Sequence, residues 1–421
     1  MKKFIKSKSF ASFLLTAGYF IFVVSTFAQT ETSEGNKFQS IPLKSQITGV
    51  QPMTGIVLWE QLDSKDSDAI QMEYSYMRYN DVVKEKGIYD WVLVEEKLNS
   101  AASRSHQIIL RFWDTYPGRE TTVPDYIKAL PDYNEIVEKS EKRDTGFPDW
   151  SHPEYQRFIL EFYKELAEKY DNDPRLAFLQ VGFGLWSEYH IYDPKEISCT
   201  NFPSKDFQAK YFQHLDTVFQ ETPWMISQDA HLPSRSPFAD QPKLLNIKFG
   251  IFDDSFHLAW KQGYNYNGWK FFGLKKYEQS PMGGEILFPS EERSIMVDEN
   301  LEQESRKFGI TFMICEQWLN WITIDRLRQH SMACGYKFEV TDFRTNETAA
   351  RVTIKNTGVA PIYYDAFVTV NGMRSGESLK YLQAGETDEF QVQSGGKNPK
   401  LSIECDRLVP GQTIEYEADL K

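Results

Sequence analysis

Cysteine and basic residues are both scarce in this sequence, which argues against several classes of protein. Cysteine occurs only four times in 421 residues, which is too few for a disulfide scaffold, and the spacing is not that of a zinc site. The cysteines are Cys199, Cys315, Cys334 and Cys405, and all three of their full pairings stay open. Basic residues are also scarce, with 47 Lys and Arg against 60 Asp and Glu. Because nucleic-acid binding rests on Lys and Arg meeting phosphate, we expect no nucleic-acid partner.

A long apolar run is missing beyond the N-terminal region. That region starts with several lysines, continues with an apolar stretch over residues 10–24 and reaches small residues at Thr26 and Ala28. This pattern predicts a cleaved secretory signal peptide over residues 1–28. The apolar stretch is shorter than the roughly 20 residues of a spanning helix, so we expect no stable membrane insertion. We expect a secreted or periplasmic protein, whose net charge would fall from −13 to −17 with the loss of four lysines.

Two motifs of common enzyme folds are absent as well. No glycine-rich phosphate loop follows an early strand, which argues against a doubly wound dinucleotide-binding sheet. The segment 182–186 reads GFGLW and lacks the serine of a nucleophile elbow. The spacing of Asp253, Asp254 and the nearby histidines is not diagnostic of a metal site. We therefore expect no organic cofactor and no metal.

The sequence does contain eight strand-like runs that alternate with helical patterns. The runs cover residues 54–60, 73–79, 107–113, 176–186, 224–228, 246–252, 282–287 and 310–314. After a polar linker at 29–50, this order predicts an α/β fold, a (β/α)8 TIM barrel, over residues 51–335. The clearest helix follows Ser151 and Glu154, which have the spacing of a capping box.

Beyond Tyr336 the pattern becomes one of short alternating strands without helices. We expect strands at 337–342, 349–355, 363–370, 389–393 and 401–404, separated by turn signals such as Asn371-Gly372. The length and spacing predict a small all-β, immunoglobulin-like sandwich over residues 336–421.

Carboxylates and aromatic residues gather where the predicted barrel strands end, which is where barrel enzymes carry their active groups. Glu188 follows the fourth strand among Trp186, Tyr189 and His190, and Glu285 follows two glycines on the seventh. Apolar neighbours would keep a proton on Glu188, so it is the candidate acid of a carboxylate pair with Glu285. The glycines would let a substrate approach the backbone. The substrate-binding candidates are Tyr76, Arg111, Trp113, Trp186, His190, Asp254 and Trp318.

These residues resemble a known family. The stretch from Tyr74 through 87–91 to Arg111 resembles the opening of clan A glycoside hydrolases of the β-galactosidase kind. From about Gly55 to the end, the chain is also similar to a group of secreted bacterial barrel proteins of unassigned function. The matching motifs are Gly184-Leu-Trp-Ser-Glu188-Tyr-His190, Asp253-Asp-Ser-Phe256 and Gly283-Gly-Glu285.

The resemblance implies that Glu188 is the acid/base and Glu285 the nucleophile, on strands four and seven. One departure is Ser187, because clan A places an asparagine before its acid/base. We therefore expect a secreted glycoside hydrolase that cleaves a poly- or oligosaccharide, with a retaining mechanism. Two alternatives stay open, a non-catalytic glycan-binding barrel and a polysaccharide lyase.

Overall fold

The computed structural model describes residues 37–191, 197–256, 263–286, 300–315 and 322–421. The chain divides into two units, 1–37 and 38–421, and all that follows concerns the second. In the described part of the chain, no helix is long and apolar enough to cross a membrane.

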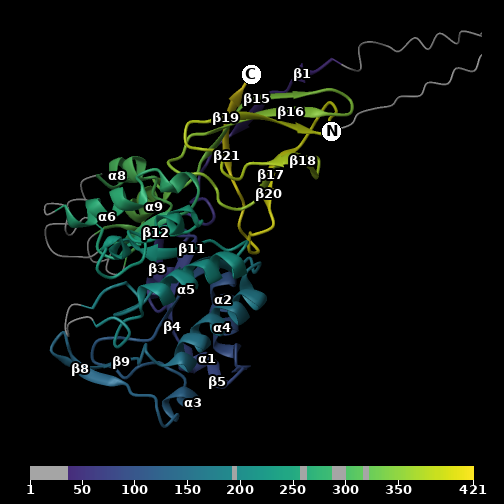
Figure 1. Ribbon diagram of the computed structural model, residues 1–421. Helices are drawn as coiled ribbons and strands as arrows, with labels where there is room; N and C mark the ends of the chain where they lie inside the picture. Colours follow the sequence, from purple (N-terminus) through teal and green to yellow (C-terminus); the bar gives the residue numbers. More distant parts are fainter. Residues whose placement is uncertain (1–36, 192–196, 257–262, 287–299, 316–321) are drawn as a thin grey trace, which may run out of the picture. The chain divides into compact units, whose positions relative to one another are not determined.

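Eight parallel strands close into a barrel, as the sequence predicts (Figure 1). In chain order they are β3 (Gly55–Trp59), β4 (Met72–Arg78), β7 (Gln107–Trp113), β10 (Leu176–Val181), β11 (Trp224–Ser227), β12 (Gly250–Asp253), β13 (Met282–Glu285) and β14 (Phe312–Ile314). Every residue of β7 is buried, because such a strand faces the barrel interior on one side and the helices on the other.

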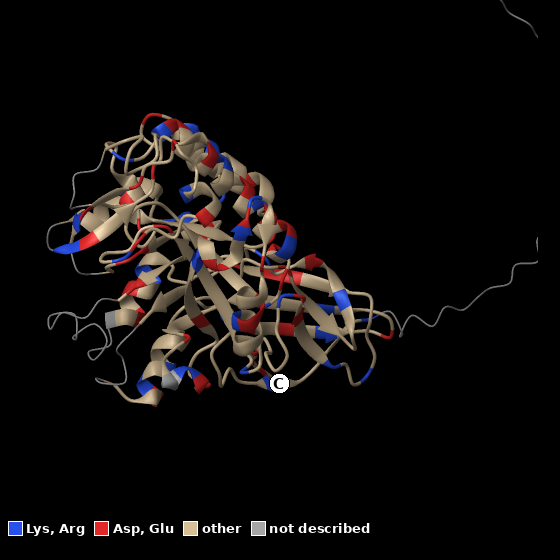
Figure 2. Ribbon diagram, turned by 90° about the horizontal axis from the view of Figure 1, so that it is seen from below, with Lys and Arg blue, Asp and Glu red and all other residues tan. Residues whose placement is uncertain are grey.

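Helices follow most barrel strands. They are α1 (Tyr79–Val82), α2 (Val92–Ala102), α3 (Asp125–Lys128), α4 (Pro153–Tyr170), α5 (Lys205–Val218), α6 (Tyr264–Phe272), α8 (Asn300–Phe308) and α9 (Ile324–Met332). Two small hairpins lie in the loops, β5–β6 (Val83–Glu85, Ile88–Tyr89) and β8–β9 (Ile136–Ser140, Arg143–Phe147). Basic and acidic positions are interspersed on the helices (Figure 2).

The start of α4 differs from the predicted capping box. The N-cap is His152, whose ring accepts a hydrogen bond from the Glu154 amide at 3.2 Å. Ser151 instead bonds the carboxylate of Asp149. The prediction misplaced the cap by one residue because a histidine nitrogen can accept this bond as well as a hydroxyl oxygen can. One face of α4 is apolar and buried, with Phe158, Phe162 and Leu166 among its residues.

The Gly-Gly pair of β13 serves strand packing. A Cβ on Gly284 would clash with the Asp253 carbonyl oxygen of β12. A Cβ on Gly283 would lie 2.7 Å from the Phe312 carbonyl oxygen and 3.0 Å from its ring. The sequence attributed these glycines to substrate approach, whereas the structure places neighbouring strands and a core ring against them.

Residues outside the barrel, both before and after it in the chain, form two further sheets. The larger has the order β19–β16–β15–β21–β2, with β1 also paired to β15, and the smaller has the order β18–β17–β20. Their bounds are β1 Gln39–Ser40, β2 Leu43–Ser45, β15 Phe338–Thr345, β16 Ala350–Asn356, β17 Ala366–Val370, β18 Met373–Ser378, β19 Thr387–Val392, β20 Leu401–Cys405 and β21 Tyr416–Leu420. Both sheets contribute to one hydrophobic cluster.

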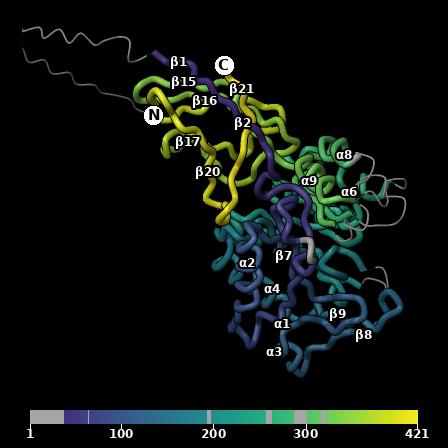
Figure 3. The backbone as a smooth tube through the Cα atoms, turned by 180° about the vertical axis from the view of Figure 1, so that it is seen from behind, coloured from purple at the N-terminus to yellow at the C-terminus, as the bar shows by residue number. Residues whose placement is uncertain are grey.

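Part of the predicted linker belongs to the larger sheet. β1 pairs with β15, and β2 pairs with β21, so the N-terminal segment lies beside the last strand of the chain (Figure 3). Strands β18 and β21 were not predicted from the sequence either. Short segments such as Leu43–Ser45 carry no strand pattern of their own. The hydrogen-bonding partners of β1 and β2 are in addition more than 300 residues away in the chain.

The two sheets pack against the N-terminal ends of the barrel strands. The Arg407 guanidinium donates to the carbonyl oxygen of Leu176, where β10 begins, and to the Thr222 hydroxyl, at 3.0 and 2.9 Å. The Tyr364 hydroxyl donates to the Ala177 carbonyl oxygen, and its ring stacks near Phe178. This end of the barrel is thus closed, and the carboxyl ends of the strands are left for the site.

Candidate active site

A cavity of about 840 Å³ opens at the carboxyl ends of the barrel strands. Glu188 and Glu285 both line it, from the loop after β10 and the end of β13. Of the predicted substrate-binding residues, Tyr76, Trp113, Trp186, His190 and Asp254 line the same cavity. The structure therefore brings together residues from five of the eight barrel strands or the loops that follow them.

The loop that carries Glu188 is tightly folded. Strand β10 ends at Val181, five residues earlier than predicted, because the chain turns back at Gly182, where a Cβ would clash with the Ser187 carbonyl oxygen. Trp186, Ser187 and Tyr189 have positive φ angles of 55°, 62° and 69°. Left-handed backbone at three non-glycine residues so close together is costly and is often found at functional sites.

Backbone hydrogen bonds hold this loop in place. The Tyr189 amide donates to the Phe183 carbonyl oxygen at 2.8 Å, and the Trp186 amide donates to that of Thr115 at 2.9 Å. The Ser187 hydroxyl donates to the Phe112 carbonyl oxygen at 2.8 Å. Because Ser187 is only 1% exposed, it cannot take the substrate-facing role of the clan A asparagine.

Glu188 is held through one of its two oxygens. Oε1 accepts hydrogen bonds from Nη1 of Arg111 at 2.8 Å and from the Tyr76 hydroxyl at 3.2 Å. Oε2 lies 3.9 Å from Nε2 of His190. The side chain of Glu188 is 11% exposed, so it reaches the cavity while most of its surface is covered.

Arg111 lies beneath the cavity rather than in its wall. Its side chain is 1% exposed, and Nη2 donates to Oδ1 of Asp254 at 2.9 Å and also to the Gln180 side chain. The guanidinium carbon lies 4.2 Å from the centre of the Phe252 ring. Arg111 is predicted to contact substrate, but its donors face Glu188, Asp254 and Gln180 instead of the cavity.

One buried cation is shared between two buried carboxylates. Burial raises the pKa of Glu188 well above its ordinary value, and the charges of Asp254 and Glu285 act in the same direction, while Arg111 opposes them. Burial also raises the pKa of Asp254, against the effect of Arg111. A carboxyl group in these surroundings can keep a proton near neutral pH, which is what a general acid requires.

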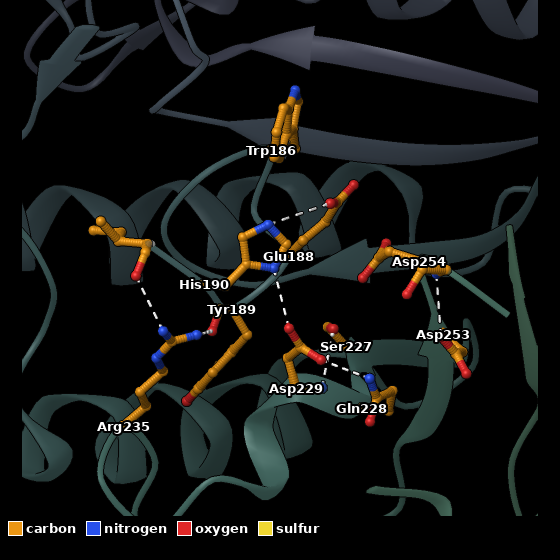
Figure 4. A network of polar contacts seen from close by, with 12 residues as sticks. Trp186, Glu188, Tyr189, His190, Ser227, Gln228, Asp229, Arg235, Asp253 and Asp254 are labelled. Carbon is orange, nitrogen blue, oxygen red and sulfur yellow. Dashed lines mark hydrogen bonds and ion pairs between the residues drawn. The ribbon is translucent and has the colours of Figure 1, made fainter. Parts of the chain in front are cut away.

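His190 is oriented by a second carboxylate. Its Nδ1 lies 3.1 Å from Oδ2 of Asp229, which belongs to a short 3-10 helix (Gln228–His231) after β11. The other oxygen of Asp229, Oδ1, accepts a hydrogen bond from the side-chain Nε2 of Gln228 at 2.6 Å. Figure 4 shows Asp229, His190 and Glu188 in a row, with the imidazole between the two carboxylates.

Aromatic rings form two walls of the cavity. On one side, Tyr116 lies with its ring centre 5.2 Å from Trp113 and 5.9 Å from Trp186. On the other side, Trp59 and Tyr76 have ring centres 4.8 Å apart. Flat apolar faces with polar groups between them are suited to binding sugar rings.

One predicted residue lies outside the described residues, and two carboxylates near strand ends are buried away from the cavity. Trp318 falls in 316–321, which the structure does not describe. Asp253 is fully buried and accepts hydrogen bonds from Trp269 and the Ser255 amide, at 2.8 and 3.1 Å. Asp114, also at a strand end, is buried and accepts a bond from the Tyr155 hydroxyl at 2.6 Å. A carboxylate at a strand end can face the helices as readily as the cavity.

Further residues of the cavity wall are not among the predicted site residues. They are Trp59, Tyr116, Lys97, Gln228 and Asp229, together with several polar residues of the rim. Trp59 and Asp229 follow predicted barrel strands, a position that indicates them only weakly, whereas Lys97 comes from α2 and no strand-end signal points to it. Within the described residues, no group of three or more His, Cys, Asp or Glu could hold a metal ion.

No protein-family model and no curated protein matches the sequence. Solved structures that resemble it include a GH36 α-galactosidase from Geobacillus stearothermophilus, 9% identical over 81% of this chain and 55% of that chain, with a TM-score of 0.40. A β-mannanase from the blue mussel Mytilus edulis is 10% identical over 70% and 96% of the two chains, TM-score 0.40.

A β-galactosidase from Rahnella sp. R3 is 12% identical over 66% of this chain and 52% of that chain, TM-score 0.39. This chain thus spans about half the length of the α-galactosidase and the β-galactosidase.

Proposed function

We propose that this protein is a secreted or periplasmic glycoside hydrolase that cleaves a poly- or oligosaccharide. The observation that carries the proposal is that Glu188 and Glu285 line one aromatic-walled cavity at the carboxyl ends of the barrel strands. Glycosidic hydrolysis needs two carboxyl groups that flank the bond to be broken. The fourth and seventh barrel strands place them on different sides of the barrel mouth.

In this mechanism Glu188 is the general acid and base. Its proton passes to the glycosidic oxygen as the bond to the anomeric carbon breaks, and Glu285 attacks that carbon to form a glycosyl-enzyme. Glu188, now a carboxylate, then removes a proton from the water that hydrolyses the intermediate. The raised pKa of Glu188 supports the first step, because a carboxyl group with an ordinary, low pKa would already have lost its proton near neutral pH.

The remaining side chains of the site support binding and orientation. The rings of Trp113, Tyr116 and Trp186 would stack on sugar rings. Arg111 and Tyr76 would hold Glu188 in one rotamer through Oε1. The predicted immunoglobulin-like sandwich would be structural, since its residues close the opposite end of the barrel.

One observation favours a second candidate, a non-catalytic glycan-binding barrel. The ion pair between Arg111 and Glu188 at 2.8 Å opposes protonation of Glu188, and a protein that only binds sugar would need no proton there. The polysaccharide lyase loses support from the same pair. Arg111 was the residue expected to neutralise a uronate, and both ends of its buried guanidinium already meet a carboxylate.

The test compares wild type with Glu188→Gln and Glu285→Gln for release of reducing ends from a panel of polysaccharides. The control variant is Glu161→Gln, which removes a carboxylate that is paired with Arg157 on α4, outside the cavity. We expect turnover to fall at least about 10³-fold in the first two variants and to change little in the third. Turnover that survives in both catalytic variants would contradict the assignment. Glycan binding without turnover by wild type would support the binding protein.

A further inference from the structure

The loop after β7 holds an arginine at the rim of the cavity. Arg119 is exposed and lines the cavity, and its guanidinium carbon lies 4.9 Å from the centre of the Tyr116 ring. The same ring contacts Trp113 and Trp186, whose ring centres are 5.2 and 5.9 Å away. A guanidinium that stacks on an aromatic face is already oriented before it binds a second group. The aromatic wall of the cavity therefore carries a positive charge.

The small hairpin β8–β9 fixes this loop. The Gly146 amide donates to the Arg119 carbonyl oxygen, and the Gly118 amide donates to the buried Thr145 hydroxyl, both at 2.9 Å. Gly118 has a φ angle of 78°, and a Cβ there would lie 2.9 Å from Cδ of Arg143. The backbone of Arg119 is thus held in place, so its charge has a defined position at the rim.

Arg119 differs from the other Lys and Arg side chains of the cavity wall, because those are neutralised by carboxylates. The Arg78 guanidinium lies 2.6 Å from Asp81, and Lys97 is paired with Glu60. Within the part of the chain that the structure describes, Arg119 makes no ion pair. Its charge is therefore available to an anionic ligand in the cavity.

Arg119 and Glu285 come from opposite sides of the barrel. In the order β13–β14–β3–β4–β7, four steps separate β13 from β7, which is the largest separation in a closed barrel of eight strands. Strand β10, whose loop carries Glu188, pairs directly with β7. In the proposed mechanism the nucleophile attacks one side of the sugar, and the leaving group departs on the other side, toward the acid. Arg119 therefore lies on the leaving-group side.

The charges of the cavity favour an anion at Arg119 and oppose one beside Glu188. A single cation, Arg111, serves both Glu188 and Asp254, and Glu285 adds a further carboxyl group to the cavity. These acids would repel an anionic substituent on the sugar whose bond is broken, whereas Arg119 would attract one on a neighbouring unit.

We propose that the substrate is an anionic glycan and that Arg119 binds a carboxylate or sulfate group on a sugar unit of the leaving group. A guanidinium presents parallel N–H donors to either group, so the two share one recognition chemistry. The side of the cleaved bond rests on the proposed function, but the binding of the anion does not. Arg119 is then a specificity residue that contacts substrate away from the reacting bond.

The first experiment measures binding without turnover. The probes are galacturonate and mannuronate oligosaccharides with their methyl esters, and carrageenan oligosaccharides with their desulfated forms. All proteins carry Glu285→Gln, so that no ligand is cleaved. With Arg119→Gln we expect affinity for the acidic forms to fall about 10-fold and affinity for the neutral forms to stay the same. Added salt should weaken binding of the acidic forms only. A loss confined to the uronates or to the sulfated sugars identifies the anion.

Two control variants isolate the charge of Arg119. Arg119→Lys keeps the charge without the planar fork and should retain part of the preference for acidic forms. Arg78→Gln removes the same charge from the same cavity, but this arginine is paired with Asp81, and we expect an effect below about 2-fold. Equal losses in Arg78→Gln and Arg119→Gln overturn the inference. It is also overturned if the protein binds no acidic probe or prefers the neutral forms.

Turnover separates this inference from the proposed function. On an acidic glycan that wild type cleaves, Arg119→Gln should raise KM about 10-fold with little change in kcat, because Arg119 binds away from the reacting bond. The rise should occur only with oligosaccharides whose acidic sugar lies on the leaving-group side, and a rise confined to the other side overturns the placement. If acidic glycans bind through Arg119 and none is cleaved, the inference stands and the hydrolase proposal fails. If only neutral glycans are bound and cleaved, the hydrolase proposal stands and the inference is overturned.

Discussion

Nη1 of Arg111 lies 2.8 Å from Oε1 of Glu188, and this ion pair is almost completely covered by protein. The other end of the guanidinium lies 2.9 Å from Asp254, so one cation serves two carboxylates. Two buried carboxylates with a single buried cation leave one negative charge uncompensated. A proton bound by one of the two carboxyl groups removes that charge. The same contacts thus decide both the stability of the site and the protonation of its candidate acid.

Arg111→Met should therefore destabilise the protein strongly. It removes the cation and leaves Glu188 and Asp254 buried without it, which we expect to lower the free energy of unfolding by about 3–5 kcal/mol at pH 7. Urea unfolding of both proteins gives the difference. The comparison variant is Arg78→Met, which breaks the exposed pair with Asp81 and should cost less than about 1 kcal/mol. Equal losses in the two variants would contradict the account of Arg111.

Asp253 should make stability depend on pH. Burial raises its pKa to about 7 in the folded protein, above the value of about 3.9 in an unfolded chain. A raised pKa means that the folded state binds the proton more tightly, so the contribution is complete below about pH 4 and is lost as the pH rises toward 7. Unfolding of wild type and Asp253→Asn between pH 4 and 8 should show a smaller decline in the variant. Parallel curves would mean that Asp253 does not titrate in this range.

Ser187→Ala separates structure from substrate contact. Loss of its hydroxyl leaves the Phe112 carbonyl oxygen buried without that bond, which we expect to cost about 1–3 kcal/mol of stability. Because the hydroxyl does not face the cavity, KM for a cleaved glycan should stay near that of wild type. A large rise in KM with unchanged stability would show instead that Ser187 meets the sugar.

Arg407→Ala should test whether the C-terminal sheets support the barrel. The side chain is 5% exposed and bonds the backbone oxygens of Asp171 and Leu176. Without it these two carbonyl oxygens lose a charged donor, and we expect a loss of about 2–5 kcal/mol, measured by denaturant unfolding. Arg374→Ala, which breaks only partly exposed pairs with Glu404 and Asp406, is the control and should cost less than about 1 kcal/mol. If Arg407→Ala costs no more than this control, the sheets contribute little through that contact.

The order of the barrel strands can be predicted from the sequence alone, and so can the segment in which each candidate carboxylate lies. Buried runs such as Gln107–Trp113 are apolar throughout because both of their faces are covered, and this pattern is local enough to be recognised. Glu188, Glu285 and the aromatic residues could be selected because the ends of parallel barrel strands meet at one mouth.

The contacts between individual atoms could not be predicted in this way. Arg111, Glu188 and Asp254 are up to 143 residues apart in the chain, and no periodicity could show that the arginine lies beneath the cavity and holds both acids. The same holds for the contact between Asp229 and His190 and for the buried hydroxyl of Ser187. It also holds for the two strands that the predicted linker adds to the larger sheet. Their reason is physical. A side chain's neighbours across a closed barrel are set by register and packing, whereas a sequence pattern records only which residues are buried nearby.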